Sequence, residues 1–336
     1  MRYLKRFNES IESYSDIKSI CKKYDITNYT INSDGSIDVD GDVDLSSLYL
    51  TKLPLKFRNV RGDFNCGDNQ LTTLEGSPKT VGGDFYCGNN QLTNLVGGPQ
   101  SVGGNFNCFR NQLTNLEGSP QSIDGNFSCY NNQLTTLDGS PQSIGGDFYC
   151  SDNQLTTLEG GPQSVGGGFY CRNNQLTTLK GAPESVGGDF DCRNNQLTTL
   201  EGSPQSVGGN FYCLNNQLTT LEGGPQTVGG YYYCSDNQLT TLESGPQSVG
   251  GDFDCANNQL INFVGFPEDF EGDIYLFDNP VKEIYDLFKN VKCIRWLNEF
   301  DVIQGNKVVL DRLEEVYHQL GMNIPENIEL SNYEII

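Results

Sequence analysis

Residues 146–166 read Gly-Asp-Phe-Tyr-Cys-Ser-Asp-Asn-Gln-Leu-Thr-Thr-Leu-Glu-Gly-Gly-Pro-Gln-Ser-Val-Gly, and close copies of this stretch follow one another along most of the chain. Ten cysteines keep the same step of 21 residues, at positions 66, 87, 108, 129, 150, 171, 192, 213, 234 and 255. A fixed period of about 20–50 residues is typical of a solenoid, in which each repeat packs against its neighbours. We therefore predict a repeat array over residues 41–281, with degenerate units at both ends.

Each repeat contains one segment in which outward and inward residues alternate, and one segment, which we call the return, that contains Glu-Gly-Gly-Pro and leads back to the next repeat. Phe148 and Cys150 fall on the same face of the alternating segment, which is the pattern of a half-buried strand. Asn153 follows where the chain turns, and an inward asparagine there can bond backbone groups that the turn leaves unpaired. Glycine and proline exclude a helix interior from the return. We expect the return to be extended or polyproline-like, with Val165 as its core residue.

Composition alone is ambiguous. Only 36% of the 336 residues are hydrophobic and the formal net charge is −22, a combination that is also typical of disorder. The repeat resolves this, because a solenoid core is one thin column that needs few apolar residues per unit. The negative charge argues against nucleic acid or anionic lipid as a partner. No apolar run reaches membrane-spanning length and the start of the chain lacks a secretion signal, so we expect a cytoplasmic protein without membrane contact.

The repeated string Phe-x-Cys-x-x-Asn-x-Leu-x-x-Leu resembles the leucine-rich repeat signature, with Phe and Cys in two leucine positions. The short return without a helix resembles the bacterial-effector subclass. The wording Asn-Gln-Leu-Thr-Thr-Leu-Glu-Gly-Ser-Pro-Gln-Ser-Val-Gly-Gly, with the flanking segments 29–41 and 309–317, is similar to leucine-rich repeat proteins encoded by tailed phages. The resemblance implies a β-rich horseshoe with a parallel sheet on its concave face and a helix-poor convex side. It implies binding, not a defined reaction.

The flanks predict two caps. Residues 1–40 indicate a tail, a helix over 9–24 and a hairpin over 29–39, which together form a small α/β cap. Residues 282–336 indicate two or three helices within 282–320 and a tail, which form a helical cap. The basic residues within 1–7 of an acidic chain are either a frayed terminus or a short docking or packaging tag.

The cysteine column invites a metal or redox interpretation, which its geometry opposes. Neighbouring turns about 4.8 Å apart would stack the sulfurs as small core-filling thiols, and free thiols indicate a reducing compartment. No Cys-x-x-Cys occurs and His318 is the single histidine, expected on a solvated helix face. Cys293 lies in a segment too short for the ligase domain that some bacterial effectors carry. We predict no enzyme activity, no metal and no cofactor.

Outward acidic residues recur at positions 63, 84, 147, 189 and 252. Asp189 and Asp191 could join a calcium site, although the nonapeptide pattern of calcium-binding rolls is absent. A solvated, charge-bearing strand face is the favoured interpretation. Gly-Gly pairs such as Gly208-Gly209 precede a strand and not a helix, so they are not phosphate loops.

Comparing the units with one another separates scaffold from surface. The Phe and Cys positions hardly change, whereas the position between them and the position after Cys vary. Tyrosine and arginine are enriched at interaction hot spots, although tyrosine also simply suits strands. We predict one concave-face patch made of Tyr86, Phe109, Arg110, Tyr130, Tyr149, Tyr170, Arg172, Arg193, Tyr212, Leu214 and Tyr233.

Two functional hypotheses follow. The first is a non-catalytic scaffold that binds a protein partner, from the host or the virus, through the concave face. The second is a phage structural or adhesin component, in the virion, whose aromatic columns stack on the sugar rings of a glycan. A phage-encoded protein of the first kind would act in the host cytoplasm.

Overall fold

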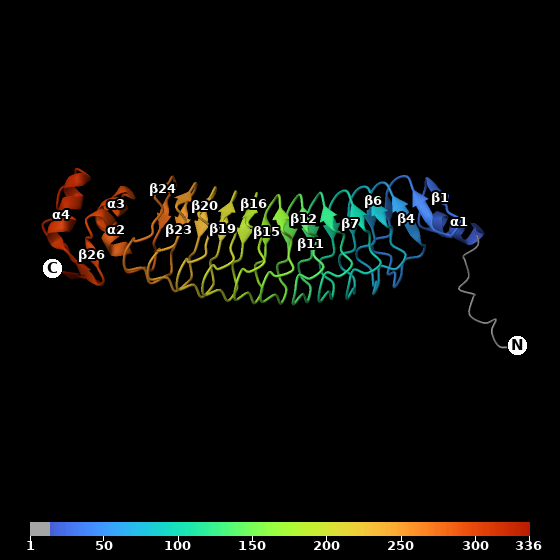
Figure 1. The fold of residues 1–336 in the computed structure, drawn as a ribbon, viewed down its shortest axis with the longest axis horizontal. Coiled ribbons are helices and arrows are strands. Elements are labelled where there is room, and N and C mark those ends of the chain that lie inside the picture. Colours follow the sequence, from blue (N-terminus) through green and yellow to red (C-terminus); the bar gives the residue numbers. More distant parts are fainter. Residues whose placement is uncertain (1–13) are drawn as a thin grey trace. The chain divides into compact units, whose positions relative to one another are not determined.

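A computed structural model describes residues 14–336, and its chain divides into two compact units, residues 1–174 and 175–336. We describe each unit by itself. In both units, each turn of the chain contributes one short strand to each of two parallel sheets. We name these the phenylalanine sheet and the valine sheet, after the core residue that most of their strands carry. Figure 1 shows the strand arrows that repeat from turn to turn within each unit.

The first unit begins with a cap and continues into repeats. Helix α1 (Tyr14–Lys23) precedes the hairpin β1 (Tyr29–Ile31) and β2 (Ile37–Val39), and β2 pairs in parallel with the first return strand, β4 (Phe57–Val60). The predicted helix and hairpin are therefore confirmed over the described residues, while residues 1–7 lie outside them. The phenylalanine sheet of this unit contains β3 (Val43–Asp44), β5 (Phe64–Asn65), β7 (Phe85–Tyr86), β9 (Phe106–Asn107), β11 (Phe127–Ser128), β13 (Phe148–Tyr149) and β15 (Phe169–Tyr170). Its valine sheet continues from β4 through β6 (Thr80–Val81), β8 (Ser101–Val102), β10 (Ser122–Ile123), β12 (Ser143–Ile144) and β14 (Ser164–Val165).

The second unit repeats this pattern and ends in helices. Its phenylalanine sheet contains β17 (Phe190–Asp191), β19 (Phe211–Tyr212), β21 (Tyr232–Tyr233), β23 (Phe253–Asp254) and β25 (Ile274–Tyr275). Its valine sheet contains β16 (Ser185–Val186), β18 (Ser206–Val207), β20 (Thr227–Val228), β22 (Ser248–Val249) and β24 (Asp269–Phe270). Helices α2 (Lys282–Phe288), α3 (Lys292–Glu299) and α4 (Leu310–Gln319) follow, with a small sheet of β26 (Ile303–Gln304), β27 (Lys307–Val308) and β28 (Glu334–Ile335).

The fold is the helix-poor β-solenoid of 21-residue turns that the sequence predicts, with a helical C-terminal cap. The return is extended, as expected, and it also pairs: Ser143 and Ile144 of one turn lie opposite Ser164 and Val165 of the next. The polyproline-like alternative is therefore wrong for these residues, because they bond to neighbouring strands. None of the helices among the described residues has the length and apolar character needed to cross a membrane.

The core of each turn is a short stack of the same side chains. Phe148, Cys150, Leu155 and Leu158 are completely buried, and Val165 is 4% exposed. Phenylalanine rings of successive turns pack with centroids about 5–6 Å apart, for example 5.1 Å between Phe106 and Phe127. Such contacts repeat from turn to turn, so each turn completes the core of its neighbour.

The turn asparagine ties neighbouring turns together. The side-chain amide of Asn153 donates to the carbonyl oxygens of Cys150 (3.1 Å) and Ser151 (3.1 Å) in its own turn, and of Cys129 (3.2 Å) in the preceding turn. Its Oδ1 accepts a hydrogen bond of 3.0 Å from the backbone N–H of Leu134. One side chain thus bonds backbone groups of two successive turns and supplies the acceptor for the buried N–H of Leu134.

All 12 cysteines are free and buried. Burial raises the pKa of Cys66 to about 12 and raises that of Cys129 further, so both thiols stay protonated at neutral pH. The thiol of Cys129 donates to the carbonyl oxygen of Tyr149 in the next turn, at 3.3 Å. The column therefore consists of neutral thiols within reach of backbone acceptors.

Candidate functional site

The outward face of the phenylalanine sheet carries two columns of variable side chains. One column lies between the buried Phe and Cys of each turn, and the other directly follows the Cys. In the first unit these columns and the residue beside them hold Tyr86, Phe109, Arg110, Tyr130, Tyr149, Tyr170 and Arg172 of the predicted patch; in the second unit they hold Arg193, Tyr212, Leu214 and Tyr233. A single patch that spans both groups stays a prediction.

Aromatic side chains of the first unit stack in pairs across neighbouring turns. The ring centroids of Phe109 and Tyr130 lie 4.9 Å apart with an angle of 7° between the planes. Tyr149 and Tyr170 stack in the same way, at 4.8 Å and 7°. We name these the 109–130 pair and the 149–170 pair. All four side chains are partly exposed, so each pair presents ring edges to solvent.

The neighbouring turns are built to accommodate the 109–130 pair. A β-carbon added to Gly88, which occupies the same column one turn earlier, would lie 3.0 Å from the ring of Phe109. Glycine at this position therefore leaves room for the ring. Phe109 is consequently covered by the backbone of Gly88 on one side and by Tyr130 on the other.

Arg110 departs from the repeat in a position with a backbone requirement. The residue before the turn asparagine has a positive φ in every turn, for example 53° at Asn89 and 55° at Asn131, and the column otherwise holds asparagine or aspartate. These are the residues that tolerate the left-handed region best. Arg110 adopts φ 51° there with an exposed side chain. The position directly after Phe109 is thus occupied by a residue that tolerates a positive φ less well than asparagine or aspartate.

The second unit contains a different cluster around Arg193. The Nη2 atom of Arg193 lies 3.1 Å from Oδ2 of Asp191, whose side chain is only 2% exposed. Its guanidinium carbon lies 5.4 Å from the ring centroid of Tyr212, within cation–π distance. Tyr212 stacks on Tyr233 at 5.0 Å and 4°. We name this group, together with Tyr231, the Arg193 cluster.

The outward acidic residues are engaged with the backbone. Oδ1 of Asp147 accepts the N–H of Gly168 at 2.7 Å, and its Oδ2 accepts the hydroxyl of Tyr149 at 2.7 Å. Burial and this hydrogen bond raise the pKa of Tyr149. In the same way, hydrogen bonding to Asp84 and burial raise the pKa of Tyr86 to about 12. The tyrosine hydroxyls are therefore held by carboxylates that also link neighbouring turns.

The favoured interpretation of a solvated acidic face is wrong for Asp191, which is 2% exposed and forms an ion pair with Arg193. Oδ1 of Asp189 accepts the N–H of Asn210 at 2.8 Å. No group of three or more His, Cys, Asp or Glu side chains in the described part of the chain has the arrangement of a metal site.

Three exposed aromatic residues of the second unit are missing from the patch that the sequence predicts. Tyr231 is 42% exposed and contacts Tyr233 edge-on, with centroids 5.9 Å apart. Tyr275 and Phe277, 48% and 62% exposed, continue the two outward columns into the last turn. Steps of 21 residues from Asp254 and Ala256 lead to them, so the period itself was sufficient to find both.

No protein-family model and no curated protein matches this chain. Similar solved structures include YopM from Yersinia enterocolitica WA-314, which has 24% sequence identity and a TM-score of 0.48 over 71% of this chain and 56% of that one. The chain therefore matches little more than half the length of that protein. The structure described as YopM, a leucine-rich effector protein from Yersinia pestis, has 18% identity and a TM-score of 0.37 over 69% of this chain and 88% of that one. At these TM-scores the likeness carries no argument about function.

Proposed function

We propose that this chain is a non-catalytic scaffold that binds a protein partner through the outward face of its phenylalanine sheet. The observation that carries the proposal is the pairing of aromatic rings on an otherwise repetitive surface. The buried Phe and Cys columns vary little between turns, whereas the outward columns concentrate Tyr, Phe and Arg at particular turns. Those residue types dominate the binding energy of protein interfaces.

The geometry of the rings favours a protein over a glycan. A sugar stacks on the open face of an aromatic ring, and stacking at 4.8–5.0 Å already covers one face of each paired ring. Phe109 has its second face against Gly88. The partly exposed ring edges suit the side chains and backbone of a protein partner.

The remaining chemistry supports a binding role in a reducing compartment. The thiols are buried and protonated, so they are poor nucleophiles and poor metal ligands. His318 is exposed on α4. We propose a cytoplasmic location because the 12 free thiols would be exposed to oxidation during folding elsewhere.

The test replaces both residues of each aromatic pair by residues that occupy the same column in other turns of the array. Phe109→Ser with Tyr130→Ser removes the 109–130 pair, and Tyr149→Asn with Tyr170→Asn removes the 149–170 pair. The wild-type chain, used as bait in a lysate of the cells that produce it, should capture a protein that is quantified by mass spectrometry. Each double variant should weaken that complex by about 2 kcal/mol or more, roughly thirtyfold in Kd.

The matched control is Gln142→Ala with Gln163→Ala, two exposed residues of the return side. This variant should bind like the wild type, and circular dichroism should show all three variants folded. Unchanged capture by both aromatic variants would refute the proposal.

The alternative role as a phage structural or adhesin component is distinguished by two further measurements. A virion component would be abundant in purified particles, and an adhesin would bind on a glycan array. Glycan binding that both aromatic variants lose, without capture of any protein, would replace the protein-scaffold proposal by this one.

A further inference from the structure

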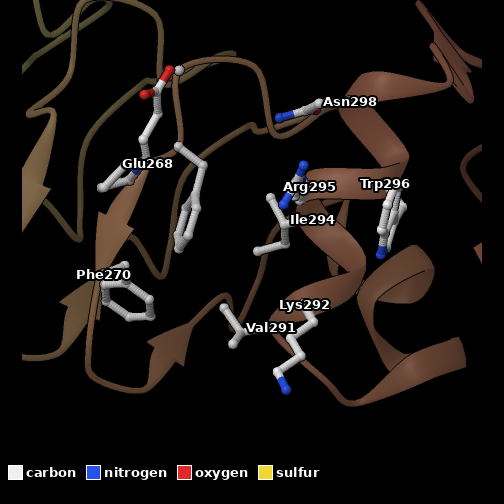
Figure 2. Close-up of a pocket in the computed structure, with 11 residues that line it drawn as sticks. Glu268, Phe270, Val291, Lys292, Ile294, Arg295, Trp296 and Asn298 are labelled. Carbon is white, nitrogen blue, oxygen red and sulfur yellow. The ribbon is translucent and has the colours of Figure 1, made fainter. Parts of the chain in front are cut away.

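A cleft of about 980 Å³ lies in the second unit between the last turn of the array and α3 (Figure 2). Phe266 and Phe270 line the side of the array, and Val291 and Ile294 line the side of the helix. Polar and charged side chains complete the lining, among them Glu268, Lys292, Arg295 and Asn298. The cleft does not include any residue of the aromatic pairs or of the Arg193 cluster.

One wall of this cleft is an unpaired sheet edge. Strand β24 is the last strand of the valine sheet and pairs with β22 alone among the described residues. The N–H of Asp269 donates to the carbonyl oxygen of Gln247 in the preceding turn, at 3.1 Å. Because backbone groups alternate in direction along a strand, the N–H and C=O of Phe270 point away from β22. An open edge of this kind is a template for one more strand.

The opposite wall is apolar with a cationic rim. Figure 2 shows Ile294 and Arg295 on the part of α3 that faces Phe270, with Lys292 next to Val291. Arg295 and Lys292 are exposed, in a chain whose formal net charge is −22. Glu268 lies on the array side of the cleft and Glu299 pairs with Arg295 at 3.5 Å, so the cations of the helix side are concentrated at Lys292 and Arg295, where carboxylates of a ligand that also carries aliphatic groups would bind.

We propose that the cleft binds an extended peptide of a partner protein, in which apolar residues alternate with acidic ones, by adding it to β24 as a further strand. The backbone of the peptide would pair with the N–H and C=O of Phe270. Side chains of an extended segment alternate in direction, so the apolar set can contact Phe266 and Val291, which are partly exposed, while the acidic set reaches Arg295 and Lys292. Strand addition between a sheet edge and a helix is a general mode of peptide recognition.

The experiment uses the full chain and three synthetic peptides of seven residues. In the first peptide valine alternates with glutamate, in the second lysine replaces every glutamate, and in the third a central proline replaces valine. Trp296 is the single tryptophan of the chain and lines the cleft, and the guanidinium carbon of Arg295 lies 5.1 Å from its ring centroid. A carboxylate that binds Arg295 should therefore change the fluorescence of Trp296.

The glutamate peptide should give a saturable change in fluorescence and should slow hydrogen exchange at the amide of Phe270 by about tenfold or more. The lysine peptide should not bind because its charge matches that of the rim, and the proline peptide should not bind because it lacks a donor and cannot continue a strand. Absence of a saturable change with the glutamate peptide, or equal binding of the proline peptide, would overturn the proposal.

Charge-reversal variants locate the binding. Lys292→Glu with Arg295→Glu should weaken the glutamate peptide by about tenfold or more and should improve the lysine peptide. The matched control is Lys289→Glu, an exposed residue outside the cleft, which should change binding by less than about twofold. Equal effects of the rim variant and the control would show that only net charge matters and would contradict a site at β24. Loss of the aromatic pairs should leave peptide binding intact.

Discussion

Asn153 shows how a single residue type stabilises the repeat. Its two N–H groups are shared among three carbonyl oxygens and its own oxygen accepts a backbone N–H, all within 3.2 Å. The side chain is 8% exposed, so water cannot replace these partners. The three carbonyl oxygens also accept from other donors, Asn174, Asn132 and the N–H of Asn131. Removing the amide therefore weakens their bonding and takes away the partner of the buried N–H of Leu134, at a cost of about 1–3 kcal/mol for that group.

Asn153→Ala should therefore lower the free energy of unfolding by about 3 kcal/mol. Denaturation in guanidinium chloride measures this change. Gln154→Ala, an exposed neighbour, should stay within about 0.5 kcal/mol of the wild type. A cost for Asn153→Ala no larger than that of the control would mean that the asparagine column does not link the turns.

Arg110 illustrates a residue that the backbone disfavours. Arg110→Asn should raise the free energy of unfolding by about 1 kcal/mol, because asparagine adopts a positive φ at lower cost than arginine. If the proposed protein partner contacts this residue beside Phe109, the same change should weaken partner capture. Thermal unfolding and capture measured on one preparation test both parts, and the reverse change Asn131→Arg should destabilise by a similar amount.

At the scale of elements, the C-terminal segment is fastened to the last turns of the second unit. The hydroxyl of Tyr333 donates to the carbonyl oxygen of Ile261 at 2.8 Å, and its side chain is 7% exposed. The backbone N–H groups of Ser331 and Asn332 donate to the two carboxylate oxygens of Glu283, at 2.7 and 2.6 Å. Strand β28 then pairs with β27, so the end of the chain belongs to the cap.

Tyr333→Phe removes the donor and leaves the carbonyl of Ile261 without this partner. The free energy of unfolding of the cap should fall by about 1 kcal/mol. Hydrogen exchange at α2 and β27 should report the loss, because local opening of the cap becomes more frequent. Asn332→Ala, which keeps the backbone bond to Glu283, should leave exchange in the cap unchanged.

The sequence predicts the elements to different degrees. Phe148 and Cys150 reveal their strand because the alternation recurs in every turn. The pairing of Ser164 and Val165 could not be predicted from their own residues, because two residues between a Gln and a glycine carry no readable alternation. The outward columns could be named from the period, but the pairing of rings depends on side-chain rotamers that sequence spacing does not determine. The ion pair of Asp191 with Arg193 depends on rotamers in the same way.

At the scale of the whole molecule, the buried thiols make stability depend on alkaline pH. An ordinary cysteine has a pKa near 9.0, whereas burial raises the pKa of Cys66 and Cys293 to about 12. Above about pH 9 the unfolded chain therefore loses protons that the folded chain keeps. The stabilisation is fully present below the unfolded pKa and is lost as the pH rises toward the folded pKa.

The free energy of unfolding should accordingly fall between about pH 9 and pH 12, steeply because many thiols contribute. Urea denaturation at a series of pH values measures this dependence. In a variant with Cys87→Ala, Cys108→Ala and Cys129→Ala, which keeps every tyrosine, the fall between pH 9 and pH 10 should be shallower. An identical slope would assign the alkaline sensitivity to other groups.

The repeated contacts of Asn153 and its equivalents also bear on how a gene for such a chain can change. Each turn meets the turn before it through the same asparagine bonds and the same buried rings. If one complete 21-residue repeat within either compact unit were duplicated or lost, the turns brought together would therefore have matching surfaces. Recombination between such similar coding segments can lengthen or shorten the protein in whole turns without a new interface. The number of turns, and with it the length of the array, can therefore vary under selection, while the contacts between neighbouring turns stay the same.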